Sequence, residues 1–174
     1  MTTFVTIDPG KKGGLVILQM EEKPYGNGLP YHIVDCRKMI NDYQALYAFF
    51  REMQIRYSPH GTLYGIIEQV HSMPKQGVVS AFTFGQGYGA LLMAMVATGF
   101  IVYQITPQQW MKDLKLKRPK EMSKLEWKKK LKDIAKQEFR NQDPTLETAD
   151  ALLIANWVLQ KELKGERPWL QSSL

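Results

Sequence analysis

The order of strand-like and helix-like runs restricts the fold of this chain more than any other feature of its sequence. Three runs rich in β-branched and aromatic residues follow one another near the N-terminus, with no helical periodicity between them. Two more strand-like runs alternate with segments of helical periodicity. The five runs are Phe4–Ile7, "LVILQM", "YHIVDC", Thr62–Glu68 and Phe100–Ile105. This order predicts an α/β protein in which helices cover a mixed sheet, and the first two runs should form a hairpin.

The helical patterns lie between and after these strands. We expect helices at Asp42 to Arg56, at Gly77–Thr98, from "TPQQWMKDL", at Ser123–Arg140, and from Asp143 and Pro144 onward. Thr106 should cap the third of them, with Pro107 in its first turn. A basic loop, Lys115–Lys120, should follow that helix. At 174 residues the chain is expected to form one domain, residues 1–174.

Acidic residues occupy positions where burial makes a charge costly. Asp8 and Glu68 each close an apolar strand run, and neighbouring strand ends can bring two carboxylates together. Glu147 and Asp150 are spaced i, i+3, which would put both on one face in the first two turns of the last, otherwise apolar helix. Any one of these acids alone is more simply a cap, an ion-pair partner or a solvated group.

Taken together, the four acids favour a metal site. Four like charges cannot crowd together unless they are protonated or neutralised. Hard divalent cations prefer oxygen ligands, so an all-carboxylate set predicts Mg²⁺ or Mn²⁺ rather than zinc. Two such ions about 4 Å apart activate a water and stabilise the leaving oxygen in phosphodiester cleavage. A two-metal site is therefore the expected cofactor arrangement.

The positive charge is concentrated in one segment. Residues Met111–Arg140 hold twelve Lys/Arg and five Asp/Glu, a net of +7, whereas the whole chain carries +6. Such a segment points to a polyanionic partner, most simply nucleic acid, although a solvated lysine-rich helix face would show the same pattern. The single cysteine, Cys36, and the absence of a secretory pattern favour a cytoplasmic location. The most apolar run, Ala90 to Val102, is shorter than the about 20 residues that span a bilayer.

Four segments carry a resemblance to a known family. "IDPGKKGG", "IIEQV", "TPQQWMK" and "ETADALLIA" resemble, in order and spacing, the signature blocks of RuvC-type Holliday-junction resolvases, over roughly Phe4 to Ala155. The resemblance implies an RNase H-like fold, with a five-stranded mixed β-sheet flanked by α-helices. It also implies a homodimer that uses divalent metal to cut four-way DNA junctions symmetrically. The hydrolysis would leave 5′-phosphate and 3′-hydroxyl ends. The short chain resembles bacteriophage or bacterial members more than mitochondrial ones.

The resemblance also assigns site residues by position. The implied acidic tetrad is Asp8, Glu68, Glu147 and Asp150. The third acid is more usually aspartate in the family, which affects the reach of the side chain. Lys112 matches a family lysine near the scissile phosphate. A second such lysine falls in "WKKKLK", at Lys128 or Lys129.

Contacts to DNA and to a second subunit follow from the same reading. His71 stands where bacterial members have an aromatic residue, and either stacks on a base or is an ordinary polar loop residue. The expected DNA-binding residues are His71, Lys75, Lys115, Lys117, Arg118, Lys120, Lys128 and Lys129. The two-fold symmetry of a four-way junction predicts a homodimer. Its expected interface is the helix Gly77–Thr98, through Phe82, Phe84, Tyr88, Leu91 and Met95, unless that helix is buried in the monomer.

Other functions remain open at this point. One is a nuclease of the same fold that also cuts flaps, forks and replication intermediates. Another is an actin-like nucleotide-binding kinase, because "DPGKKGG" after a strand resembles a phosphate loop; it needs a second phosphate motif and a larger second domain, and no nucleotide cofactor is expected. A third is a DNA-binding protein without catalysis, for which Asp8→Asn would change nothing beyond binding. We expect branched DNA as the partner and no membrane association.

Overall fold

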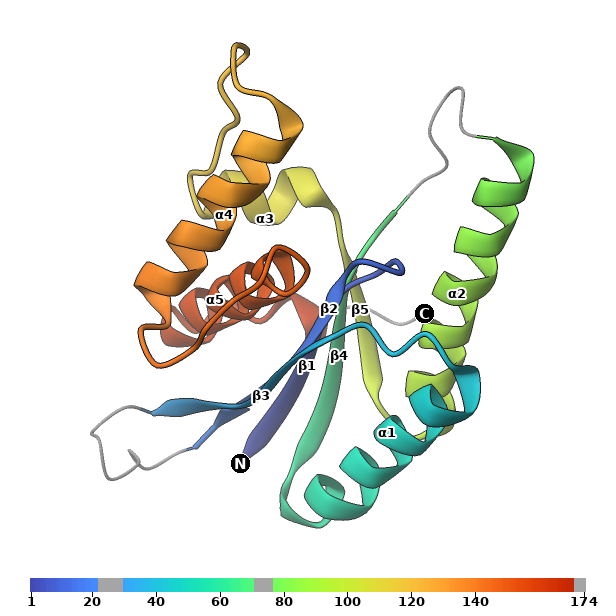
Figure 1. The fold of residues 1–174 in the computed structure, drawn as a ribbon. Helices are drawn as coiled ribbons and strands as arrows, with labels where there is room; N and C mark the ends of the chain where they lie inside the picture. Colours follow the sequence, from blue (N-terminus) through green and yellow to red (C-terminus); the bar gives the residue numbers. More distant parts are fainter. Residues whose placement is uncertain (22–29, 71–76, 171–174) are drawn as a thin grey trace.

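The computed structural model describes residues 1–21, 30–70 and 77–170. In this part of the chain, five strands form one sheet in the order β3-β2-β1-β4-β5 (Figure 1). The strands are β1 (Thr2–Asp8), β2 (Gly14–Met20), β3 (Tyr31–Lys38), β4 (Thr62–Glu68) and β5 (Ile101–Ile105). The number of strands and their positions confirm the sequence prediction to within a few residues.

The sheet is mixed, as predicted. β1 pairs antiparallel with β2, and β2 pairs antiparallel with β3, so the expected hairpin is present. β4 lies parallel to β1 on one side and to β5 on the other. Because β1 and β4 run in the same direction with Ile7 opposite Ile67, the residues that follow, Asp8 and Glu68, end their strands at the same edge.

Helices cover both faces of the sheet. α1 (Tyr43–Tyr57) and α2 (Val78–Ala97) lie on one face. α3 (Pro107–Asp113), α4 (Lys124–Glu138) and α5 (Ala149–Leu163) lie on the other, with α5 against β1 and β2 and α4 outside α5 (Figure 1). Short 3₁₀ turns occupy Ser58–His60 and Pro168–Leu170. Thr106 caps α3 by accepting a hydrogen bond from the N–H of Gln109, as the sequence predicts.

Alternation along the strands divides the core into two halves. Phe4 faces the α4–α5 side, whereas Val5 and Ile7 face the α1–α2 side. α5 is buried without interruption from Ala149 to Leu159, because the sheet covers one side of it and α4 covers the other. α5 is therefore a central element of the fold, and its first turn is held firmly.

The last helix begins later than the sequence predicts. We expected it to start at Asp143 and Pro144, but α5 starts at Ala149. The hydroxyls of Thr145 and Thr148 compete for the backbone: the N–H of Thr145 donates to Thr148 Oγ1 at 2.9 Å, and the N–H of Glu147 donates to Thr145 Oγ1 at 3.3 Å. These bonds form a turn before the helix, so Glu147 lies in the turn and only Asp150 lies in the helix.

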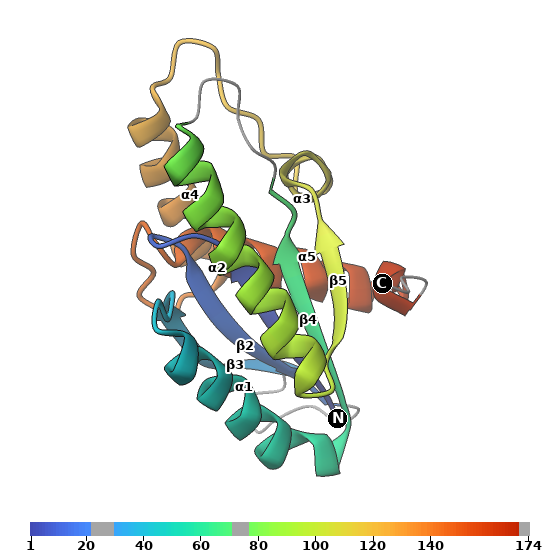
Figure 2. The ribbon, with the colours of Figure 1, turned by 90° about the vertical axis from the view of Figure 1, so that its right-hand side faces the viewer.

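α2 lies in front of the sheet in the view of Figure 2. Several of its large apolar side chains are exposed to solvent. It is 20 residues long, and only Leu91, Ala94 and Met95 of it are buried. By length and composition alone, α2 is long and apolar enough to cross a membrane. The apolar run identified in the sequence, Ala90 to Val102, is too short for that. Exposed apolar side chains on one helix are typical of a surface that binds a partner.

Candidate active site

Two strand ends and one helix start bring three carboxylates together. Asp8 ends β1 and Glu68 ends the adjacent β4. Asp150 comes from the first turn of α5, which is fastened to β1 because the Thr6 hydroxyl donates a 2.8 Å hydrogen bond to the carbonyl of Ala151. Asp8 and Asp150 are largely buried, with side chains 13% and 9% exposed. We call Asp8, Glu68 and Asp150 the acid cluster.

Two glycines allow the chain to approach this cluster closely. A Cβ on Gly13 would lie 1.9 Å from the carbonyl oxygen of Asp8, which the turn between β1 and β2 could not accommodate. A Cβ on Gly14 would lie 2.9 Å from the carbonyl oxygen of Glu147 and from Thr148 Cα. The glycine pair therefore lets the turn before α5 pack directly on β2, which places Asp150 beside Asp8.

The carboxylates of the acid cluster perturb one another. Burial, together with the charges of Asp150 and Glu68, raises the pKa of Asp8 from 3.8 to about 8, although Lys128 opposes the shift. Burial also raises the pKa of Glu68 from 4.5 to about 6; a hydrogen bond from Trp110 opposes this shift and the charge of Asp150 adds to it. Upward shifts of this kind are expected for carboxylates such as Asp8 and Glu68 that are buried near other negative charges.

One cation already lies in the cluster. Lys128 Nζ is 2.5 Å from Asp150 Oδ2 and 3.8 Å from Asp8 Oδ2. The sequence left Lys128 and Lys129 as equal candidates, and the structure brings only Lys128 to the acids. Lys129 is exposed, and its charge acts on Glu126.

Trp110 is a site residue that sequence reasoning missed. Its fully buried ring donates a 2.8 Å hydrogen bond from Nε1 to Glu68 Oε2. The sequence did contain a signal, a tryptophan on a short predicted helix. A buried indole N–H usually needs a hydrogen-bond acceptor, so a polar partner for Trp110 could have been expected. The acceptor could not be known until α3 was placed against the end of β4.

Glu147 does not join the acid cluster in this structure. Its carboxylate accepts a 3.3 Å hydrogen bond from Lys38 on β3 and is 32% exposed. Hydrogen bonds from Thr145 and Lys38 lower its pKa, whereas burial and like charge raise the pKa of Asp8. Because Glu147 lies in the turn before α5, the predicted i, i+3 pairing with Asp150 on one helix face is not formed.

Most of the predicted basic residues are exposed on α3 and on the loop that follows it. Lys112 is exposed on α3, where its charge acts on the neighbouring Asp113. The loop between α3 and α4 is exposed at Lys115, Lys117, Arg118 and Lys120. His71 and Lys75 lie outside the described residues.

The donor chemistry of the acid cluster fits a hard cation. Asp150 Oδ1 is buried and accepts no hydrogen bond in the part of the chain that the structure describes, so it has a free lone pair in a desolvated place. All the donors are carboxylate oxygens, the ligands that Mg²⁺ and Mn²⁺ prefer. Among the described residues, however, no three His, Cys, Asp or Glu side chains are arranged as a ready ligand set. The acids thus have the donor atoms that such a metal prefers, but the cation that lies among them in this structure is the ammonium group of Lys128.

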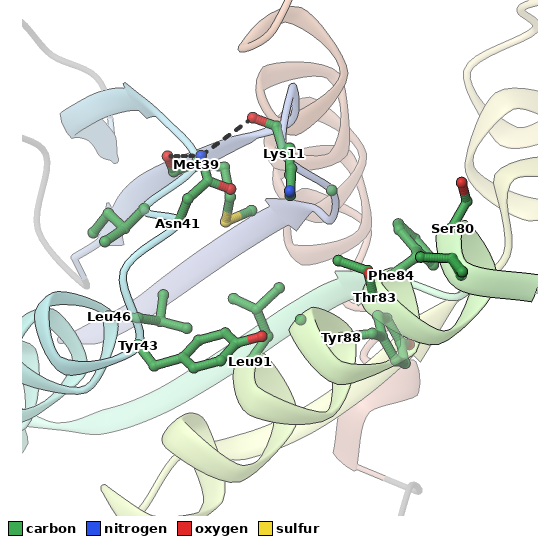
Figure 3. A pocket seen from close by; sticks show the side chains of 14 residues that line it. Lys11, Met39, Asn41, Tyr43, Leu46, Ser80, Thr83, Phe84, Tyr88 and Leu91 are labelled. Atoms are coloured by element: carbon green, nitrogen blue, oxygen red, sulfur yellow. Dashed lines mark hydrogen bonds between the residues drawn. The ribbon is translucent and has the colours of Figure 1, made fainter.

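A separate hollow lies on the opposite face of the sheet. It measures about 420 Å³ and is bounded by α1, α2 and the turn after β1 (Figure 3). Its lining includes Lys11, Tyr43, Phe84 and Tyr88 and contains no acidic side chain. It is therefore distinct from the acid cluster, whose Asp150 and Lys128 come from the α4–α5 side.

The residues predicted for the dimer interface divide into two groups. Leu91 and Met95 are buried in the core of the chain, so their assignment to an interface is corrected. Tyr88 is half-buried and donates a 2.7 Å hydrogen bond to Gln104, while Phe84 lines the hollow. Phe82 is 67% exposed. The other exposed apolar side chains of α2 are Val78, Val79, Met93 and Val96.

The glycines of α2 face open space. We expected Gly85, Gly87 and Gly89 to mark close approach of another backbone, but within the described residues no atom lies within 4 Å of a Cβ built on any of them. Their low helix propensity, about 1 kcal/mol each against alanine, is thus not explained by packing inside this chain.

The sheet order and strand directions define an RNase H-like α/β fold, the class predicted from the sequence. Within this class, the structure of RuvC from Thermus thermophilus is similar to the chain, with a TM-score of 0.61 and 21% identity over 94% of this chain and 96% of RuvC. T. thermophilus RuvC in complex with a Holliday junction substrate is similar over the same shares, with a TM-score of 0.61 and 19% identity. The chain therefore has a RuvC-type fold. No protein-family model and no curated protein matches its sequence.

Proposed function

We propose that this protein is a metal-dependent endonuclease that resolves four-way DNA junctions by paired symmetric cuts, leaving 5′-phosphate and 3′-hydroxyl ends. The observation that carries the proposal is the convergence of Asp8, Glu68 and Asp150 at one edge of a RuvC-type fold. The structure of T. thermophilus RuvC with a Holliday junction supports four-way junctions as the substrate. The cytoplasm of a bacterial or phage-infected cell is the proposed location.

The acid cluster would hold the metal. Asp8, Glu68 and Asp150 supply carboxylate oxygens, and Glu147 would complete the tetrad after leaving Lys38. Bound there, two Mg²⁺ or Mn²⁺ ions would supply Lewis-acid chemistry and a nucleophile at neutral pH. Trp110 keeps the Glu68 carboxylate in one orientation. Because Asp8 and Asp150 are largely buried, water screens their negative charges only weakly.

The basic surface would hold the DNA backbone. Lys112 and the exposed loop residues Lys115, Lys117, Arg118 and Lys120 are proposed phosphate contacts, together with Lys129 on α4 and with His71 and Lys75. Contacts of this kind bind phosphates without reading bases, so we expect a steep salt dependence and little sequence information.

A homodimer would pair two such sites through α2. Val78, Phe82, Met93 and Val96 are exposed and recur at spacings close to a heptad seam. Gly85 and Gly89 lie between them on the same seam, with open space above both. A second copy of α2 packing there by two-fold symmetry would bury the apolar side chains and explain the glycines.

The test is cleavage of an end-labelled synthetic four-way junction, beside a flap and a plain duplex, with Mg²⁺ or Mn²⁺ and with EDTA. We expect paired symmetric nicks in the junction, lost in Asp8→Asn while DNA binding is kept. Equal cutting of flap and junction would replace the proposal with a general branched-DNA nuclease of the same fold. Binding without cutting by the wild type would leave a non-catalytic DNA-binding protein.

A further inference from the structure

Lys128 is built into the acid cluster by the packing of α4. Trp127, Leu131 and Ala135 form the buried stripe of that helix against α5. Ser123 starts the helix with a capping box, which sets where its first turn begins. With the helix held at its start and along its buried face, Lys128 projects beside Trp127 toward Asp150, and its position is a consequence of the fold.

The ammonium group of Lys128 lies against two of the acids. It donates to Asp150 Oδ2 and is 3.8 Å from Asp8 Oδ2, and a lysine with such partners is charged at neutral pH. Among the described residues it is the cation nearest to Asp8 and Asp150. A divalent cation bound to the same oxygens would repel this ammonium at a distance of a few ångströms in a poorly screened site.

We propose that Lys128 is a resident counter-cation of the acid cluster: it offsets part of the negative charge of the acids when metal is absent, and a divalent cation must displace it in order to bind. This inference rests on the proposed metal-dependent function. The side chain is already 41% exposed, so it can swing outward on its flexible stem. Once displaced, Lys128 is free to contact a DNA phosphate, which links metal loading to substrate binding.

The test measures metal binding without DNA. Mn²⁺ is titrated by calorimetry into the full-length wild type, into Lys128→Met, and into the control Lys129→Met, which removes an exposed charge one residue away. Breaking the hydrogen bond from Lys128 to Asp150 opposes metal binding wherever Lys128 is present, so Lys128→Met should bind Mn²⁺ roughly tenfold more tightly than the wild type. Lys129→Met should bind as the wild type does. The Mn²⁺-induced rise in Tm should likewise be larger in Lys128→Met.

A Mn²⁺ affinity of Lys128→Met that equals that of the wild type, or is weaker, would overturn the inference. The proposed nuclease function would still stand if the wild type cleaved junctions. No Mn²⁺ binding by the wild type or by either variant would overturn both. A second measurement is NMR of the lysine ammonium groups. The signal of Lys128 is identified as the one that is missing in the conservative variant Lys128→Arg. On addition of Mg²⁺, the NMR signal of the Lys128 ammonium should shift as it leaves Asp150, and an unchanged signal would also overturn the inference.

Discussion

The indole N–H of Trp110 donates a 2.8 Å hydrogen bond to Oε2 of Glu68, and this bond joins a buried core residue to the acid cluster. Trp110 is fully buried between α3 and the sheet, so its ring cannot turn away without opening the core. Glu68 is thereby held by a donor that solvent does not compete with. The bond also opposes the burial effect on the pKa of Glu68, which nevertheless stands at about 6.

Trp110→Phe should shift the pH dependence of cleavage. The variant keeps an aromatic ring and removes the donor that favours ionised Glu68, so the pKa of Glu68 should rise further above 6. Because the ionised form is the one proposed to bind metal, the acidic limb of the pH–rate profile should move to higher pH. Stability should fall by about 1–3 kcal/mol. Trp157→Phe is the matched control, since Trp157 donates to Asp113 outside the cluster; an equal shift in both variants would contradict the assignment.

Without metal, the protein should lose stability as the pH rises. The pKa of Asp8 is raised from 3.8 to about 8 and that of Glu68 from 4.5 to about 6, so the folded state binds more protons than the unfolded state between these values. The stabilising effect is complete below pH 3.8 and is lost as the pH rises through 8. Thermal unfolding in EDTA should therefore show a falling Tm from pH 5 to pH 8. A Tm that does not change with pH in the wild type would contradict this prediction. So would an Asp8→Asn variant whose Tm falls with pH as steeply as that of the wild type.

Gly14→Ala should damage both stability and cleavage. Its Cβ would meet the backbone of Glu147 and Thr148 at 2.9 Å, so the turn before α5 would have to move off β2 and carry Asp150 with it. We expect a loss of about 1–3 kcal/mol, measured by urea unfolding, and much weaker cleavage. Gly87→Ala is the control, because no described atom lies within 4 Å of its Cβ; it should gain about 0.5–1 kcal/mol from helix propensity. Similar behaviour of the two variants would refute the close approach.

Phe82→Glu should convert a dimer into a monomer. Phe82 is the exposed aromatic side chain of the proposed α2 seam, and a charge there would be buried against its symmetry mate. Sedimentation at micromolar concentration, with and without junction DNA, measures the mass. Leu125→Glu alters a comparably exposed apolar residue on α4 and should leave the mass unchanged. A wild type that is monomeric in both conditions would rule out the dimer.

The basic loop should contribute to affinity through salt-dependent binding of phosphates. Lys117→Ala or Lys120→Ala removes an exposed charge between α3 and α4, so the slope of log K against log salt should fall by about 1 for each phosphate that the variant no longer neutralises. Fluorescence anisotropy of a labelled junction over a salt series measures this slope. Lys164 lies at the end of α5 opposite Asp150, and Lys164→Ala should keep the wild-type slope. If all three variants keep the wild-type slope, the loop does not bind phosphates.

Features set by short-range patterns could be predicted from the sequence. The five strands, the hairpin, the Thr106 cap and the basic loop all depend on residues close together in the chain, and the structure confirms them. The meeting of Asp8 and Glu68 was also predictable, because each closes a strand and parallel neighbours end at one edge of a sheet. Alternation and turn chemistry carry this information without any knowledge of long-range packing.

The tertiary structure alone decided which side chains face the acids. Lys128 and Lys129 differ by about 100° around a helix, so the choice between them depends on how α4 packs on α5. The hydroxyls of Thr145 and Thr148 delay the start of α5 and leave Glu147 beside Lys38. Trp110 reaches Glu68 across 42 positions, and Leu91 and Met95 turn inward because the sheet covers that side of α2. Each of these outcomes depends on contacts between residues far apart in sequence, which periodicity and local propensity do not encode.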